Sequence, residues 1–177
     1  MTVDTQITAD ELLRMPDDGW RYELVQGELR KLSPAGEEHG DIAIEIATSL
    51  RHYVKHHRLG KAYGPDVGFR IARDPDTVRS PDAAFVSAER VVRTPKYFEG
   101  PPDVAFEVIS PSDSYSDVEE KTLDYLRAGT RVVVVVNPRT RVVRLHRRDG
   151  VETVNDVLEI EDVIPGWRLP LAELFEE

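Results

Sequence analysis

The run Val104-Ala105-Phe106-Glu107-Val108-Ile109 is apolar except for one carboxylate near its centre. A short apolar run of this kind predicts a buried strand. An ionised carboxylate buried there costs several kcal/mol unless a cation, a metal ion or hydrogen bonds compensate it. We therefore expect Glu107 to have such a partner in the folded chain.

A second acid opens the apolar run upstream, where Pro81-Asp82 precedes the predicted strand Ala83-Ala84-Phe85-Val86. Side chains alternate between the two faces of a strand, so Asp82 shares its face with Ala84. If the two strands are neighbours, both carboxylates can point to the same side. We then expect Asp82 and Glu107 within about 6 Å, a separation that one Mg²⁺ ion can bridge.

A lysine follows on the next predicted helix. Ser116 and Glu119 have the capping-box pattern, which predicts a helix from there through Ala128. Lys121 shares the inward stripe of this helix with Tyr125, so we expect its ammonium group within several ångströms of Glu107. The alternative is a snorkelling side chain whose ammonium group reaches solvent.

The other elements predict an α/β fold in which helices flank a mixed sheet. A helix, three strands, a crossover helix and a buried strand follow one another along the chain. The expected elements, in order, are a short helix from a capping box at Thr8, a hairpin around Gln26-Gly27, an amphipathic helix over 39–57, strands over 61–72, 81–86 and 104–110, the helix with Lys121, a strand over 132–136 buried on both faces, and an edge strand over 141–147.

Composition narrows the class of protein. The chain has 177 residues, enough for one full core, and no cysteine, which excludes disulfides, thiolate metal sites and a cysteine nucleophile. No apolar run approaches the roughly 18 residues of a membrane span, and Met1–Gln6 has no signal-peptide pattern. We expect a cytoplasmic protein without membrane contact.

The net charge of −10 argues against a general nucleic-acid coat protein. The charge is unevenly distributed, however. Residues 151–177 hold eight acids and one base, whereas residues 131–150 hold six arginines and one acid. Basic surface can therefore exist beside an acidic C-terminal segment, although such runs are as well explained by solvated faces.

Several separated motifs together resemble the Uma-two family of restriction-endonuclease-like proteins, within the PD-(D/E)XK nuclease superfamily. The resemblance spans residues 8 to about 145. The motifs that carry it are Tyr22-Glu23-Leu24-Val25-Gln26-Gly27-Glu28, Ser33-Pro34-Ala35-Gly36 with His39, Pro81-Asp82, the stretch over 103–112, and Lys121 with Tyr125.

The resemblance implies a restriction-endonuclease-like core and an endonuclease that hydrolyses nucleic-acid phosphodiester bonds, with DNA favoured over RNA. It implies Asp82, Glu107 and Lys121 as catalytic residues, with one or two Mg²⁺ or Mn²⁺ ions on Asp82 and Glu107. We expect one domain over 1–177: an N-terminal helix and hairpin over 8–32, the nuclease-like core over 39–147 and the acidic segment over 151–177. The resemblance also implies a homodimer, as do two expected exposed edges, the hairpin and the strand over 141–147.

One position departs from the superfamily pattern. The superfamily lysine stands two residues after the acid, and Ile109 occupies that position here. Lys121 can supply the missing charge from the helix. If it does not, the chain is a catalytically silent nuclease-like module that binds or assembles without cutting.

Two further residues each have two possible roles. Glu23 is either an additional acid of the site or the cross-strand partner of Arg30. His39 falls on the apolar side of its helix, where a lone histidine is more often a capping or core residue than a base, although the resemblance places it toward the site. Asp103 shares the parity of Glu107 but lies roughly 13 Å along the strand, so we expect a strand-start hydrogen bonder.

Overall fold

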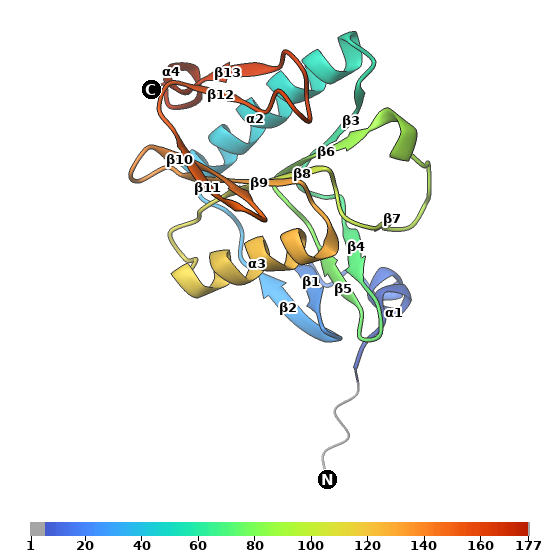
Figure 1. Ribbon diagram of the computed structural model, residues 1–177. Helices are drawn as coiled ribbons and strands as arrows, with labels where there is room; N and C mark the ends of the chain where they lie inside the picture. Colours follow the sequence, from blue (N-terminus) through green and yellow to red (C-terminus); the bar gives the residue numbers. More distant parts are fainter. Residues whose placement is uncertain (1–5, 177) are drawn as a thin grey trace.

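The computed structural model describes residues 6–176, so most of Met1–Gln6 lies outside the description. Figure 1 shows a central mixed sheet with helices on both sides. The central sheet has six strands in the order β11-β10-β9-β8-β6-β3. Its strands are β3 (Gly60–Tyr63), β6 (Ala83–Ser87), β8 (Val104–Val108), β9 (Val132–Asn137), β10 (Val142–Arg147) and β11 (Gly150–Val154).

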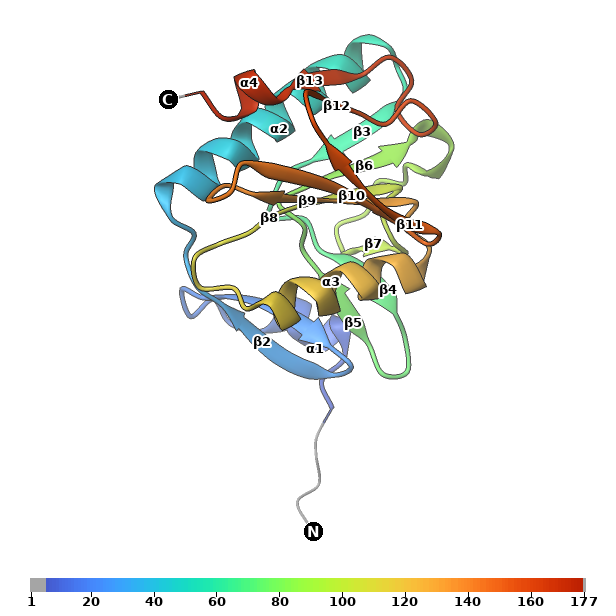
Figure 2. The ribbon, with the colours of Figure 1, turned by 60° about the vertical axis from the view of Figure 1, so that its left-hand side comes forward.

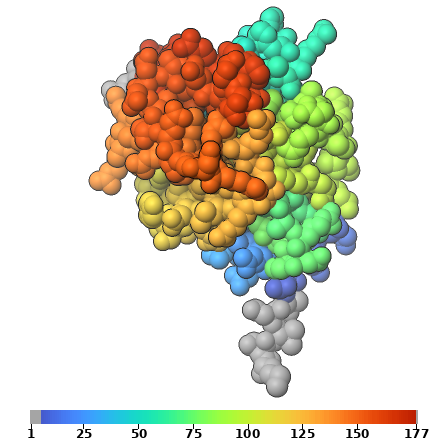
Figure 3. All heavy atoms as spheres, in the orientation of Figure 1, coloured from blue at the N-terminus to red at the C-terminus, as the bar shows by residue number. Residues whose placement is uncertain are grey.

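One face of this sheet is covered by the long helix α2 (Glu37–His56) and by the C-terminal elements. Ile46 and Leu50 of α2 are fully buried against Phe106 of β8, and the ring of Trp167 meets Phe106 edge-on at 5.8 Å. The C-terminal elements are β12 (Val157–Glu159), β13 (Arg168–Pro170) and α4 (Leu171–Leu174). In Figure 3 the C-terminal residues form one continuous region of surface at the top of the view.

The other face packs on α3 (Tyr115–Ala128) and on a second sheet, as the turned view in Figure 2 shows. The second sheet has the order β2-β1-β5-β4-β7. It consists of β1 (Arg21–Val25), β2 (Glu28–Leu32), β4 (Phe69–Ala72), β5 (Thr77–Arg79) and β7 (Phe98–Glu99). The short helix α1 (Ala9–Arg14) lies at the border of this second sheet. The short helix η1 (Ala88–Arg90) follows β6 in the chain.

The sheet forms where the valine run predicts it. Val132, Val134 and Val136 enter the core under α2, while Val133 and Val135 enter the core under α3. Between α2 and α3 the central sheet receives β3, β6 and β8, and β9 then follows α3 in parallel to β8. The expected order of helix, three strands, helix and strand is therefore confirmed for this sheet.

Two expectations about strands are wrong. The stretch 61–72 is not one strand, because Gly64-Pro65-Asp66 turns the chain and sends β3 and β4 into different sheets. The strand over 141–147 is not an edge, because β11 pairs with β10 along its length, from Val143–Val154 to Arg147–Gly150. The short strand β5 was not expected at all.

The start of α3 also differs from the expectation. Its capping box is formed by Ser114 and Asp117 rather than by Ser116 and Glu119. Both pairs have the same spacing, so the sequence pattern alone does not choose between them. The capping box of Thr8 with Glu11 is confirmed. The amphipathic helix is confirmed as α2, which begins two residues before its expected start.

Candidate active site

A cleft of about 440 Å³ opens where the ends of β6 and β8 meet the N-terminal ends of α2 and α3 and the hairpin of β1 and β2. All five residues singled out from the sequence line this cleft: Glu23, His39, Asp82, Glu107 and Lys121. They come from five different elements or their ends, so only the tertiary fold brings them together.

The two carboxylates stand opposite each other on neighbouring strands. Ala83 of β6 pairs with Phe106 of β8, and the amide of Asp82 donates to the Phe106 carbonyl at 3.0 Å. This register places Asp82 across from Glu107. Asp82 is held there because its Oδ2 accepts a 2.7 Å hydrogen bond from the amide of Val108.

Lys121 joins this pair from α3. Its Nζ donates to Glu107 Oε2 at 2.8 Å and lies 3.4 Å from Glu23 Oε1. Burial opposes its charge, but the carboxylates of Glu107 and Glu23 outweigh burial and raise the pKa of Lys121. The ammonium group is therefore enclosed by acids and remains protonated, which rules out the snorkelling alternative.

Glu107 has two unlike oxygens. Oε2 accepts a hydrogen bond from Lys121, whereas Oε1 is buried away from that ammonium group. Burial raises the pKa of Glu107 to about 7; the charges of Asp82 and Glu23 add to this effect, and Lys121 opposes it. The buried hydroxyl of Tyr125 lies beside Glu107, and burial, followed by the charge of Glu107, raises the pKa of Tyr125.

Glu23 belongs to this cluster rather than to Arg30. The two residues do pair across the strands, but Glu23 is 1% exposed and binds Arg79, with Nη1 at 2.9 Å. The amide of Ser80 also donates to Glu23 at 2.8 Å. Although burial acts in the opposite direction, Lys121 and Arg79 together lower the pKa of Glu23. Glu23 is therefore a buried anion of the cleft.

Arg79 is the cleft residue that sequence reasoning missed. It lies on β5 and bridges Glu23 to Asp124 of α3, which it reaches at 2.6 Å. The sequence places Arg79 only three residues before Asp82, and this closeness is the feature that could have indicated a site residue. Because the strand β5 was not expected, there was no reason from the sequence to expect Arg79 to be buried.

His39 lies near the start of α2 with its Nε2 3.2 Å from Asp82 Oδ2. Hydrogen bonding to Asp82 raises the pKa of His39, while burial acts in the opposite direction. Its Nδ1 is buried without a partner among residues 6–176. His39 is thus a neighbour of the carboxylate pair and not a residue of the apolar core. Asp103, in contrast, accepts from the Ser87 amide and contacts Arg90 at 2.8 Å, a structural role at the strand start as expected.

The donor set suits a hard cation with few protein ligands. Within residues 6–176, no group of three or more histidine, aspartate or glutamate side chains has the arrangement of a metal site. Mg²⁺ nevertheless accepts one or two carboxylates and completes its shell with water and phosphate oxygens. The carboxylates of Glu107 and Asp82, opposite each other on neighbouring strands, are the groups that could supply these oxygens.

The mixed sheet flanked by α2 and α3 has the fold of the restriction-endonuclease-like class of α/β proteins. The chain belongs to the Uma2 family, described as "Putative restriction endonuclease", whose family model matches residues 9–172. This is the Uma-two family that the sequence motifs resemble.

A solved structure supports the fold assignment. The crystal structure of "a putative nuclease belonging to DUF820 from Anabaena variabilis ATCC 29413" superimposes with a TM-score of 0.82. The alignment covers 96% of this chain and 97% of that chain at 21% sequence identity. Among curated proteins, none matches the chain. In the described part of the chain, no helix combines the length and apolar character needed to cross a bilayer.

Proposed function

We propose that the chain is a Mg²⁺- or Mn²⁺-dependent endonuclease that hydrolyses phosphodiester bonds in nucleic acid, DNA before RNA, in the cytoplasm. The observation that carries this proposal is the 2.8 Å contact between Lys121 Nζ and Glu107 Oε2, opposite Asp82. Lys121 thus brings a positive charge to the acid pair although Ile109 occupies the usual lysine position.

Each residue has a chemical task in this proposal. Asp82 and Glu107 would hold one or two ions, and a bound ion lowers the pKa of water and neutralises charge on the phosphate. The oxygen of an attacking water bonds to phosphorus as it loses a proton to solvent. The bond from phosphorus to the leaving sugar oxygen then breaks, and that oxygen takes up a proton.

The raised pKa of Lys121 decides its role. A lysine that stays protonated is no general base, so Lys121 acts by its positive charge on the phosphoryl oxygens or on the attacking water. Glu23 and Arg79 help to hold Lys121 in position, because Glu23 lies 3.4 Å from Lys121 and is itself bound by Arg79.

The silent module remains the second candidate. The observation that favours it is that Lys121 and Arg79 already neutralise Glu107 and Glu23 within the chain. Such an ion network can serve the fold alone, so activity must be measured.

The test is cleavage of plasmid and single-stranded DNA with Mg²⁺, with Mn²⁺ and with a chelator. We expect metal-dependent cleavage that Glu107→Gln and Lys121→Met each reduce by about 10²-fold or more, because each removes a charge used in the transition state. Glu119→Gln is the matched control, since Glu119 is exposed on α3 and does not line the cleft. Folded protein without cleavage under any condition would favour the silent module.

A further inference from the structure

We propose that a second cleft binds the nucleic-acid chain as a single strand beyond the carboxylate cleft. This cleft has a volume of about 480 Å³ and lies where β3, the β3–β4 turn and the segment before β7 meet. The lining residues that matter for binding are Lys61, Tyr63, Asp66, Arg93, Lys96 and Tyr97. The inference rests on the proposed function, since it extends the path of the same polymer.

Charge is the first argument. The lining has three basic side chains and one acidic one, on a chain whose net charge is −10. Lys96 is bound to Asp10 at 2.9 Å. Lys61 and Arg93 have no carboxylate partner among residues 6–176, so two cations are available to phosphates.

Aromatic side chains are the second argument. Tyr63 and Tyr97 are both half-buried in the lining, and burial raises the pKa of each hydroxyl. The Tyr63 ring is held edge-on against Phe69 at 5.8 Å, and the ammonium group of Lys61 lies over the ring, 5.7 Å from its centroid, so cation and ring form one fixed surface. Val92 is 66% exposed at the same cleft. Bases of a single strand stack on such surfaces, whereas the bases of a duplex are already stacked on each other.

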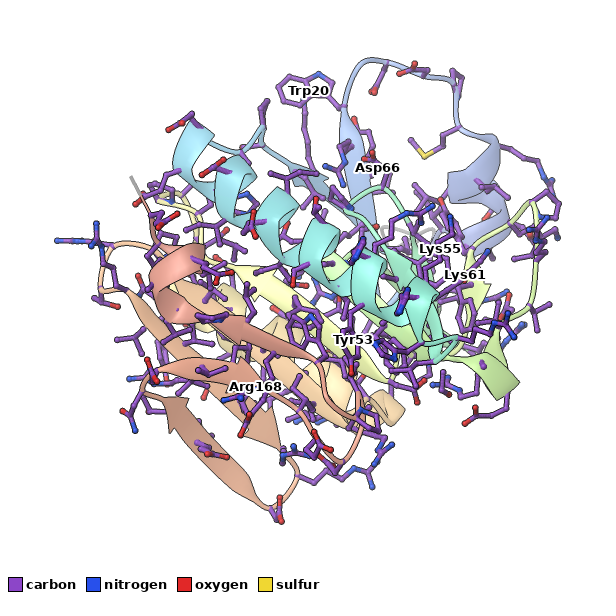
Figure 4. All side chains as sticks on the ribbon, turned by 90° about the horizontal axis from the view of Figure 1, so that it is seen from above. Trp20, Tyr53, Lys55, Lys61, Asp66 and Arg168 are labelled. Atoms are coloured by element: carbon purple, nitrogen blue, oxygen red, sulfur yellow. The ribbon has the colours of Figure 1, made fainter. Side chains whose placement is uncertain are left out.

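The third argument is that the two clefts adjoin. Arg21 lines the carboxylate cleft and lies 3.3 Å from Asp66, which lines the second cleft. In Figure 4, Trp20 and Asp66 lie on one side of α2 and Arg168 on the other, and Lys61 lies near the C-terminal end of α2. An enzyme that cuts inside a chain must hold nucleotides on both sides of the cut phosphate. The second cleft provides a place for the strand that leaves the first.

The experiment measures binding of fluorescein-labelled oligothymidylates to the full chain by anisotropy, in EDTA so that no strand is cut. The oligonucleotides have about four and about sixteen nucleotides, the range of single-strand site sizes. The variant is Lys61→Ala with Arg93→Ala. The matched control is Arg139→Ala with Arg144→Ala, which removes the same charge from exposed residues that line neither cleft. Circular dichroism and thermal melts verify that both variants are folded.

We expect the variant to bind the long oligonucleotide roughly tenfold more weakly at 0.1 M salt, and its salt dependence to be shallower by about 1.4 in slope, about 0.7 for each lost phosphate contact. The short oligonucleotide should bind more weakly than the long one, and all binding by the control should stay close to wild type. An unchanged affinity of the Lys61/Arg93 variant, equal loss in the control, or no binding of the long oligonucleotide overturns the inference.

Failure here is distinguishable from failure of the proposed function. If the wild type cleaves with metal but the Lys61/Arg93 variant binds oligonucleotides as tightly as wild type, the proposed nuclease function stands and the second cleft is not a binding site. If oligonucleotide binding depends on Lys61 and Arg93 but no metal supports cleavage, the second cleft is a binding site and the chain is a silent module.

Discussion

At Glu107 the two oxygens of one carboxylate meet different surroundings. Oε2 is bound by Lys121, and the buried hydroxyl of Tyr125 also lies beside this carboxyl group. A buried acid without such partners would cost free energy. Lys121 and Tyr125 are thus the described groups that can compensate the carboxyl group of Glu107.

This arrangement predicts a pH-dependent stability. The pKa of Glu107 is raised from 4.5 to about 7 in the folded chain, so its ionisation opposes folding. The contribution is favourable below pH 4.5 and is lost as the pH rises toward 7. Glu107→Gln cannot ionise, so its stability relative to wild type should increase by on the order of 3 kcal/mol between pH 4.5 and 8.

Urea unfolding of both proteins in EDTA, across this pH range, measures the difference. Glu119→Gln is the control and should follow wild type at every pH. A constant difference between Glu107→Gln and wild type would show that the burial of Glu107 does not penalise its charge.

Among the elements, β5 connects the layers around the cleft. It is only three residues long, yet Arg79 at its end ties β1 to α3 through Glu23 and Asp124. All three β5 residues are buried. The strand thus determines how far the hairpin of β1 and β2 lies from the helix that carries Lys121.

Loss of Arg79 should therefore destabilise the protein strongly. Arg79→Met keeps much of the side-chain volume but leaves Glu23 with Lys121 as its remaining cation and removes the 2.6 Å partner of Asp124, at a cost of about 3–5 kcal/mol. Chemical unfolding at neutral pH measures this cost. Arg139→Met, at an exposed position, should change stability by less than about 0.5 kcal/mol. An equally small effect of Arg79→Met would mean that the ion network contributes little to the fold.

For the molecule as a whole, the homodimer stays a proposal, with a different edge. β10 is covered, so the edge strand on this side of the central sheet is β11, where Val151 is 60% exposed, and β3 is the other edge. Twofold pairing of β11 edges would cover this strand in both copies. We expect light scattering to give twice the chain mass of 20.1 kDa at micromolar concentration. Val151→Lys should shift this mass to one chain, because it puts two lysines at the pairing edge, and a single-chain mass for wild type would contradict the dimer.

Local patterns in the sequence were sufficient for the main elements and for the residues of the acid pair. Hydrophobic periodicity and residue composition predict the valine strand, the amphipathic helix and the apolar strands around Asp82 and Glu107. Lys121 could be placed toward Glu107 because helix spacing determines which side chains share a face. The Uma-two motifs identified the family before any fold was known.

The partners of these residues were decided only by the tertiary structure. Whether Glu23 meets Arg30 or Arg79, and whether the strand over 141–147 is an edge, depends on which strands lie side by side. Strand pairing joins segments far apart in the chain, as between β1 and β5 or β8 and β9. Periodicity within one segment carries no information about its neighbour, whereas burial and charge neutralisation in the folded core do decide the pairing.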